Sequence, residues 1–139
     1  IYNDGTGASV LTGGRRFSDS CSTDIFIHMD GQEVFKFAVK SVPTAIETLL
    51  HNNNMDINDV DKFILHQANV RIIESVAKRL KADKDKFPVN LNEYGNTSSA
   101  SIPILLDELN RNGSLKQGEK LILAGFGAGL SWGSILLVW

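Results

Sequence analysis

The sequence predicts a layered α/β domain in which helices cover a largely buried sheet. Segments with apolar residues every three or four positions alternate with short, continuous apolar runs, which suit strands buried on both faces. The 139 residues, 42% hydrophobic and 22% charged, are typical of one soluble globular domain. A net charge of −2 and the lack of an eighteen-residue apolar run argue against nucleic-acid and membrane partners.

Three segments have the periodicity of helices. They run from residue 31 to about 52, from about 69 to 80, and from about 99 to 112. Pro43 lies inside the first, so a kink is expected there. Pro103 falls in the first turn of the third, where its missing N–H costs little.

Apolar runs and turn residues predict the strands. A short strand follows the glycines of residues 4–11, and a polar loop is expected over residues 13–24. The other predicted strands cover residues 62–66, 87–92, 121–124 and 134–139.

The segment His66-Gln67-Ala68-Asn69 is a candidate site because it lies between an apolar strand and a helix start. Ligands of open α/β sheets bind beyond the carboxyl ends of strands. A histidine that merely ends the strand is the alternative, and spacing alone favours neither. The positive end of a helix capped by Asn69 disfavours a protonated imidazole, and a neutral imidazole can donate one N–H to a developing oxyanion.

Two further motifs are turns. Residues 93–101 are by themselves typical of an Asn-Gly turn followed by a serine helix cap. The Gly-x-Gly pattern within residues 125–133 precedes β-branched and apolar residues, whereas a nucleotide loop precedes a helix. We therefore expect a turn between two strands whose backbone N–H groups stay open to a ligand.

Other reactive or charged side chains form no constellation. Cys21 has no base beside it, so an unreactive surface or half-buried thiol is expected, and one cysteine cannot form an internal disulfide. The spacing of histidine, cysteine and aspartate indicates no metal site. Arg71, Lys78 and Arg79 share roughly one helix face, which by itself favours an ordinary solvated surface.

Together, the motifs resemble the C-terminal half of the 3-oxoacyl-[acyl-carrier-protein] synthase III enzymes, also called ketoacyl synthase III. The resemblance is carried by residues 66–69, 95–98, 125–129 and 131–133, with 4–8 and 31–35 in support. Each motif is modest alone, but the ordered set covers nearly the whole chain and is specific. It implies a thiolase-like fold, a mixed sheet covered by helices, in an enzyme that is normally a homodimer, with residues 1–139 as the C-terminal domain.

The resemblance also implies a reaction. A cysteine takes the acyl group of acyl-coenzyme A, and the acyl-enzyme condenses with malonyl-acyl-carrier protein, with loss of carbon dioxide, to begin fatty acid biosynthesis. The enzymes are cytoplasmic and need no cofactor beyond the coenzyme A thioester. His66 and Asn96 match the two side-chain donors to the enolate oxygen, and the Ala128 N–H matches part of a second oxyanion hole.

Further roles follow from the same resemblance. The matching substrate-binding positions are Gly31, Phe35, Ala68, Asn69, Ile72 and Phe126. The matching carrier-protein docking positions are Lys36, Arg71, Lys78 and Arg79.

Two departures from the family matter. The family's cysteine lies in the N-terminal half and Cys21 does not match it, so we expect this chain to be inactive alone. The stretch between Leu11 and Gly31 is shorter than the family's, which would alter the acyl tunnel or the mouth of the site. Two alternatives stay open: a related acyltransferase of specialised metabolism, and a non-catalytic fragment that binds coenzyme A or carrier protein.

Overall fold

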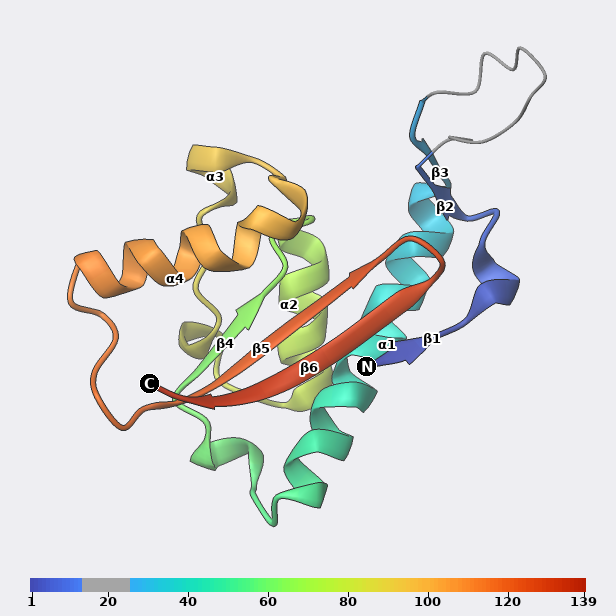
Figure 1. The fold of residues 1–139 in the computed structure, drawn as a ribbon. Coiled ribbons are helices and arrows are strands. Elements are labelled where there is room, and N and C mark those ends of the chain that lie inside the picture. Colours follow the sequence, from blue (N-terminus) through green and yellow to red (C-terminus); the bar gives the residue numbers. More distant parts are fainter. Residues whose placement is uncertain (14–25) are drawn as a thin grey trace.

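The computed structural model of the chain describes residues 1–13 and 26–139 and has a four-stranded mixed sheet at its centre (Figure 1). The strand order is β1-β6-β5-β4, with β4 parallel to β5 and the other neighbours antiparallel. The strands are β1 (Tyr2–Asn3), β4 (Lys62–Leu65), β5 (Lys120–Gly127) and β6 (Ser131–Val138). The predicted α/β class is therefore confirmed, as are the strands on both sides of the glycine turn.

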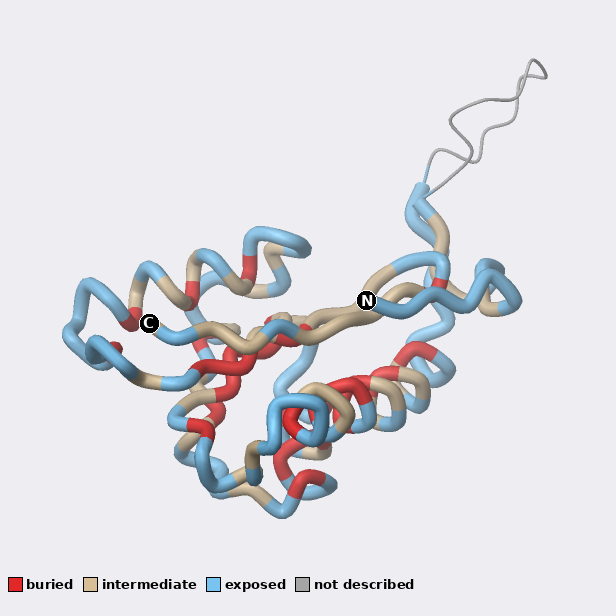
Figure 2. Tube along the Cα trace, turned by 60° about the horizontal axis from the view of Figure 1, so that its bottom comes forward, coloured by how far each residue is buried: buried red, intermediate tan, exposed pale blue. Residues whose placement is uncertain are grey.

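Helices cover both faces of this sheet, as Figure 2 shows. The pair α1 (Gly31–Asn52) and α2 (Val70–Leu80) packs on one face, and α4 (Ser101–Arg111) packs on the other. In β4, Phe63 belongs to the core cluster of the α1–α2 side and Ile64 to that of the α4 side, as strand alternation requires. A strand buried on both faces needs the continuous apolar run seen in the sequence.

The first two helices begin where their caps lie. The Asp30 side chain accepts the N–H groups of Gln32 and Glu33, and the Asn69 side chain accepts that of Arg71. Such bonds satisfy N–H groups that have no intrahelical partner. The predicted bounds of both helices are confirmed.

Helix α1 continues through Pro43, whose nitrogen offers no proton to the carbonyl of Val39 four residues earlier. Arg79 of α2 donates from Nη1 to that carbonyl, with an N···O distance of 3.3 Å. A side chain of the neighbouring helix therefore replaces the missing bond and joins α2 to α1. The predicted kink at Pro43 stays a prediction.

The predicted strand at residues 87–92 is wrong, because α3 (Leu91–Tyr94) occupies its end and no ladder pairs the rest. Pro88 has no N–H to give to a neighbouring strand. The N–H of Asn90 is donated to Oε1 of Gln67 at 3.3 Å, and is thus also unavailable to a sheet. Hydrogen bonds to polar side chains and the stacking of buried Phe87 on Phe63, rather than a strand partner, hold this segment.

Helix α4 starts two residues later than predicted, because the 3-10 turn η4 (Ser98–Ala100) precedes it. Pro103 still lies in its first turn. The short strand predicted after the first glycines is β2 (Leu11–Thr12), which pairs antiparallel with β3 (His28–Met29) in an arm that projects from the body (Figure 1). Cys21 and nearly all of the predicted 13–24 loop lie outside the described residues.

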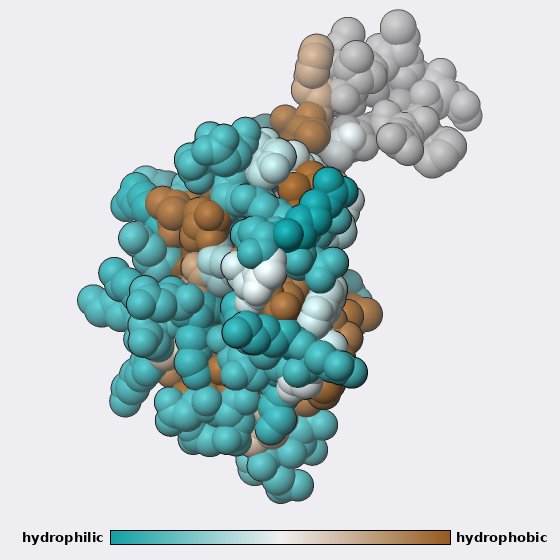
Figure 3. Space-filling view, turned by 90° about the vertical axis from the view of Figure 1, so that its left-hand side faces the viewer, coloured by the Kyte–Doolittle hydropathy of each residue, from teal (hydrophilic) through white to brown (hydrophobic). Residues whose placement is uncertain are grey.

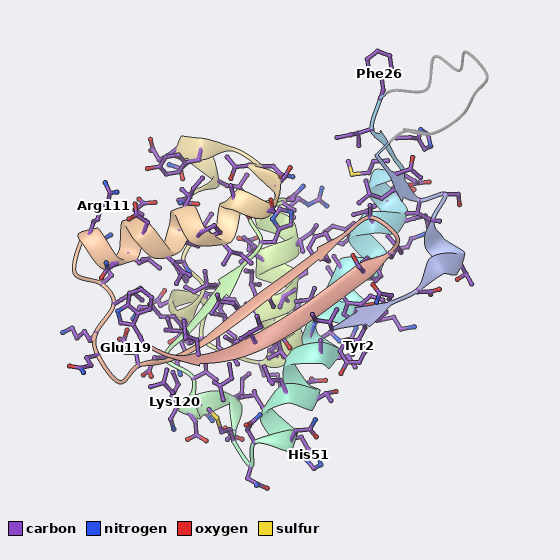
Figure 4. The ribbon with its side chains drawn as sticks, viewed as in Figure 1. Tyr2, Phe26, His51, Arg111, Glu119 and Lys120 are labelled. Carbon is purple, nitrogen blue, oxygen red and sulfur yellow. The ribbon has the colours of Figure 1, made fainter. Side chains whose placement is uncertain are left out.

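Exposed apolar side chains remain at the arm and on the sheet. Phe26, which Figure 4 shows pointing away from the body, and Ile27 are each 76% exposed. Ile135 and Val138 of β6 are 61% and 63% exposed. Figure 3, viewed toward the α4 end, shows hydrophobic areas set between hydrophilic ones. Within residues 1–13 and 26–139, no helix is long and apolar enough to cross a membrane.

Candidate active site

A cavity of about 680 Å³ opens at the carboxyl ends of β4 and β5. Because these two strands are parallel neighbours, the residues that follow them meet at one edge of the sheet. The start of α4, the loop before it, and the β2–β3 arm complete the wall. His66, Asn96 and Ala128, which come from three separate segments, all line this cavity.

His66 directly follows β4, and its backbone N–H still bonds to the carbonyl of Ala124 in β5 at 2.9 Å. The ring meets Phe126 edge to face, with centroids 5.4 Å apart, and its Nδ1 lies 2.6 Å from Oγ of Ser101. Burial lowers the pKa of His66 below its ordinary 6.5. A neutral imidazole is thus favoured, as the sequence predicts, and burial is the cause.

Asn96 lies in a tight turn before α4. Its Oδ1 accepts the N–H of Ser98 at 2.9 Å. Ser98 has a φ of 53°, in the left-handed region that side chains other than glycine rarely adopt. Since the amide oxygen is committed to the turn, Nδ2 is the group that Asn96 offers to the cavity as a donor. The segment is therefore both a turn and part of the site.

The glycine motif forms the opposite wall. At Gly125, an added Cβ would lie 3.7 Å from the Cβ of His66, an ordinary van der Waals distance, so the strand runs beside this side chain. Gly129 has a φ of +126°, which favours glycine in the turn between β5 and β6. Gly125, Phe126, Gly127 and Ala128 all line the cavity. The predicted strand–turn–strand is confirmed.

Residues 50–139 match the family described as 3-Oxoacyl-[acyl-carrier-protein (ACP)] synthase III C terminal. The chain belongs to this family. The β-ketoacyl-[acyl-carrier-protein] synthase III of Clostridium tetani is 54% identical over 114 residues, covering 82% of this chain and 34% of that protein. The Streptococcus mutans protein of the same name is 41% identical over 99% of this chain and 45% of its own length.

Solved structures of synthase III confirm the thiolase-like fold. That of the Thermus thermophilus enzyme has a TM-score of 0.90 and 39% identity, covering 99% of this chain and 44% of that one. The priming β-ketosynthase of the R1128 polyketide pathway has a TM-score of 0.86 and 34% identity, covering 99% and 43%. The chain thus spans between a third and a half of the length of these relatives.

The substrate-binding positions suggested by the synthase III resemblance divide into two groups. Ala68 and Phe126 line the cavity. Asn69 caps α2, Gly31 begins α1, and Ile72 is 6% exposed within the α1–α2 core. The Arg71 guanidinium lies over the ring of Phe35, 5.9 Å from its centroid. Asn69, Gly31, Ile72 and Phe35 are not among the residues that line the cavity, and their contacts with substrate stay a prediction.

The basic positions assigned to carrier docking are exposed. Lys36 forms an ion pair of 2.6 Å with Glu33 one turn away, which raises the pKa of the lysine. Lys78 and Arg79 lie in the last turn of α2, and Arg79 is the residue bonded to the carbonyl of α1. Docking stays a prediction, and Arg79 has a structural contact as well.

The buried polar side chains at the cavity were not predicted from the sequence. Gln67, Asn90 and Ser101 are the buried polar residues of the described chain, at 0%, 5% and 2% exposure. The amide of Gln67 donates to the carbonyl of Leu65 at 2.9 Å, and Asn90 Nδ2 donates to Glu108 at 2.7 Å. Gln67 and Ser101 lie inside the segments 66–69 and 93–101 that were already candidate motifs. A polar residue next to a predicted apolar run was the signal that could have identified them.

Other parts of the described chain offer no comparable chemistry. Hollows of about 650 and 550 Å³ lie on α4 and beside α1, and neither is lined by a histidine. Among the described residues, no three histidine, cysteine or carboxylate side chains are placed to hold a metal ion.

Proposed function

We propose that this chain supplies the histidine–asparagine half of an active site that condenses an acyl-coenzyme A starter with malonyl-acyl-carrier protein to give 3-oxoacyl-acyl-carrier protein. The observation that carries the proposal is the meeting of His66, Asn96 and Ala128 in one cavity. Synthase III relatives that are 41–54% identical support it. The nucleophilic cysteine would come from a part of the protein outside this chain.

The proposed reaction has three steps. The cysteine thiolate attacks the acyl carbon, and coenzyme A leaves as a thiolate. Malonyl thioester then loses carbon dioxide, and the electron pair of the broken C–C bond becomes an enolate. The enolate carbon attacks the acyl-enzyme, whose cysteine leaves as a thiolate, and a 3-oxoacyl thioester results.

His66 and Asn96 serve the second step by donating hydrogen bonds to the enolate oxygen. Fixed donors are effective because they are already in place where negative charge develops. The lowered pKa of His66 keeps the imidazole neutral near pH 7, so it stabilises the oxygen by an N–H bond and keeps its proton. The Ala128 N–H would serve the tetrahedral oxyanion of the third step.

The proposal extends to the setting of the reaction. Acyl-coenzyme A and acyl-carrier protein are the proposed partners, with no cofactor beyond the thioester. The full-length protein is proposed to be a cytoplasmic homodimer, as the family resemblance implies. Lys36, Arg71, Lys78 and Arg79 are the proposed docking surface for the acidic carrier protein.

The test compares the intact protein with this chain alone. The intact protein should release carbon dioxide from malonyl-carrier protein and form the 3-oxoacyl product when acetyl-coenzyme A is supplied. The chain alone should take up no acetyl group from acetyl-coenzyme A, as mass spectrometry would show. A stoichiometric acetyl thioester on Cys21 would contradict the assignment of the nucleophile to another part of the protein.

A second candidate keeps the chemistry and changes the pathway. The likeness to a polyketide priming β-ketosynthase, at 34% identity and a TM-score of 0.86, supports a starter-loading role in specialised metabolism. Competition between acetyl-coenzyme A and longer acyl-coenzyme A starters, with product masses as the readout, distinguishes the two. A strong preference for a longer starter would favour the second candidate.

A further inference from the structure

Ser101 lies directly behind the imidazole of His66. It is the first residue of α4 and is 2% exposed, at the wall of the cavity. Its Oγ lies 2.6 Å from Nδ1 of His66 and 3.1 Å from the backbone nitrogen of Gln67. These two contacts are the side-chain hydrogen bonds of Ser101 within the described residues.

The backbone N–H of Gln67 can only donate, so Oγ of Ser101 accepts from it. The oxygen could accept a second hydrogen bond, from a proton on Nδ1, but the hydroxyl's own proton would then have no acceptor among the described residues. Within residues 1–13 and 26–139, its other hydrogen-bond partner is Nδ1 of His66. An acceptor at Nδ1 is a nitrogen without a proton, so a neutral ring must carry its proton on Nε2.

We propose that Ser101 is a positioning residue that holds neutral His66 in the tautomer protonated at Nε2, the ring nitrogen left for the cavity. The importance of this tautomer for catalysis rests on the proposed function, whereas the assignment of the tautomer rests only on the hydrogen bonds of Ser101. With the proton on Nδ1, the ring would donate to Ser101 and present a lone pair to the substrate. A lone pair repels an enolate oxygen, so only the Nε2–H tautomer can serve as a donor.

The surroundings of the pair hold this geometry. Gln67 is anchored by its own side chain, which donates to the carbonyl of Leu65 and accepts the N–H of Asn90. Its backbone N–H is thereby kept on Ser101. On the other side, the edge-to-face contact with Phe126, at an interplanar angle of 68°, restricts rotation of the ring.

The direct test is the tautomer in the intact protein, labelled with nitrogen-15 in histidine. Long-range proton–nitrogen correlation spectra at neutral pH distinguish a protonated from an unprotonated Nδ1. His28 and His51, both exposed, give reference signals in the same spectrum. We expect His66 to show one tautomer, with Nδ1 unprotonated. A His66 signal with Nδ1 protonated would overturn the inference.

Two variants separate positioning from simple structural support. Ser101→Ala should admit the Nδ1–H tautomer and lower kcat for malonyl decarboxylation about tenfold, with a smaller change in KM. Ser101→Thr keeps a hydroxyl and should keep both the tautomer and most of the rate. If Ser101→Ala leaves the His66 tautomer as in the wild type, the inference is wrong.

Misfolding of Ser101→Ala would be revealed by shifted signals of His28 and His51. The wild-type tautomer and Ser101→Thr then decide alone. A protein with the Nε2–H tautomer but no decarboxylation contradicts the proposed function and leaves the positioning intact. Decarboxylation by a protein with His66 protonated at Nδ1 contradicts only the positioning.

Discussion

The polar side chains at the His66 cavity form buried hydrogen bonds, whereas the basic side chains on the surface of α1 and α2 are exposed to solvent. At the cavity, Ser101 and Gln67 are buried, and Ser101 is bonded to the His66 ring and to the backbone N–H of Gln67. On the surface, Lys36 pairs with a carboxylate in solvent, and Lys78 lies exposed in the last turn of α2. Losing a buried partner leaves the other group unsatisfied, whereas water replaces an exposed one. Changes at the cavity should therefore alter chemistry and stability, and changes on the surface should alter partner encounter.

The largest expected effect is the loss of an oxyanion donor. In the intact protein, His66→Ala and Asn96→Ala should each lower the malonyl decarboxylation rate by about 10²–10³, since this is typical for one such donor. Acylation of the cysteine should be less affected, because the two donors are proposed to act in malonyl decarboxylation. Rapid-quench assays of each half-reaction provide the measurement. An equal fall in acylation and decarboxylation would contradict the roles assigned to both residues.

The next effect concerns stability behind the cavity. Gln67→Leu removes the amide that serves the Leu65 carbonyl and the Asn90 N–H, and should lower the free energy of unfolding by about 1–3 kcal/mol. Gln117→Leu, at an exposed position, is the matched control and should change it little. Urea denaturation of the intact protein measures both. Equal losses in the two variants would mean that burial of Gln67 carries no special weight.

A smaller effect appears in the dependence of stability on pH. Burial lowers the pKa of His66 below 6.5, so below pH 6.5 the unfolded state binds a proton that the folded state resists. The free energy of unfolding should be unaffected above that pH and should fall as the pH decreases toward the folded pKa. Urea denaturation at about pH 7.5 and about pH 5.5 should show a smaller difference for His66→Gln than for the wild type. The same difference in both proteins would refute this linkage.

The smallest expected effect is at the surface. Lys78→Glu should raise the KM for malonyl-carrier protein several-fold at low salt, with less effect at moderate salt, because exposed charges act mainly on association. Lys116→Glu is a matched control: it makes the same charge change at an exposed position before β5, at the sheet end where Figure 4 labels Glu119, opposite the cavity. Kinetics with acetyl-coenzyme A should change little in either variant. Identical carrier-protein kinetics in both variants would mean that Lys78 is an ordinary solvated residue with no role in docking.

The sequence predicted the fold wherever one local signal dominates. The bounds of α1 and α2 follow from caps and apolar stripes, and β4 from an apolar run buried on both faces. The segment 87–92 was mispredicted because its apolar residues suggest a strand while Asn90 gives its N–H to a distant side chain. Propensity carries no information about such a partner.

The candidate site shows the same division. His66 and Asn96 could be found because they lie in motifs with a known order. Ser101 lies in the same segment as Asn96 but within a helix predicted from about residue 99, and its contact with a residue 35 positions away exists only after folding. The side of the ring that faces Ser101, and so the tautomer, could not be predicted from spacing.

The bond between Arg79 and the Val39 carbonyl makes two distant positions depend on each other. Arg79 is useful to α1 because Pro43 leaves that carbonyl without its own helix partner. A substitution that restores an N–H at position 43 would make the arginine's bond to this carbonyl unnecessary, whereas losing the arginine first would leave the exposed carbonyl to water. The effect of either substitution thus depends on which occurs first, so the two positions should show epistasis.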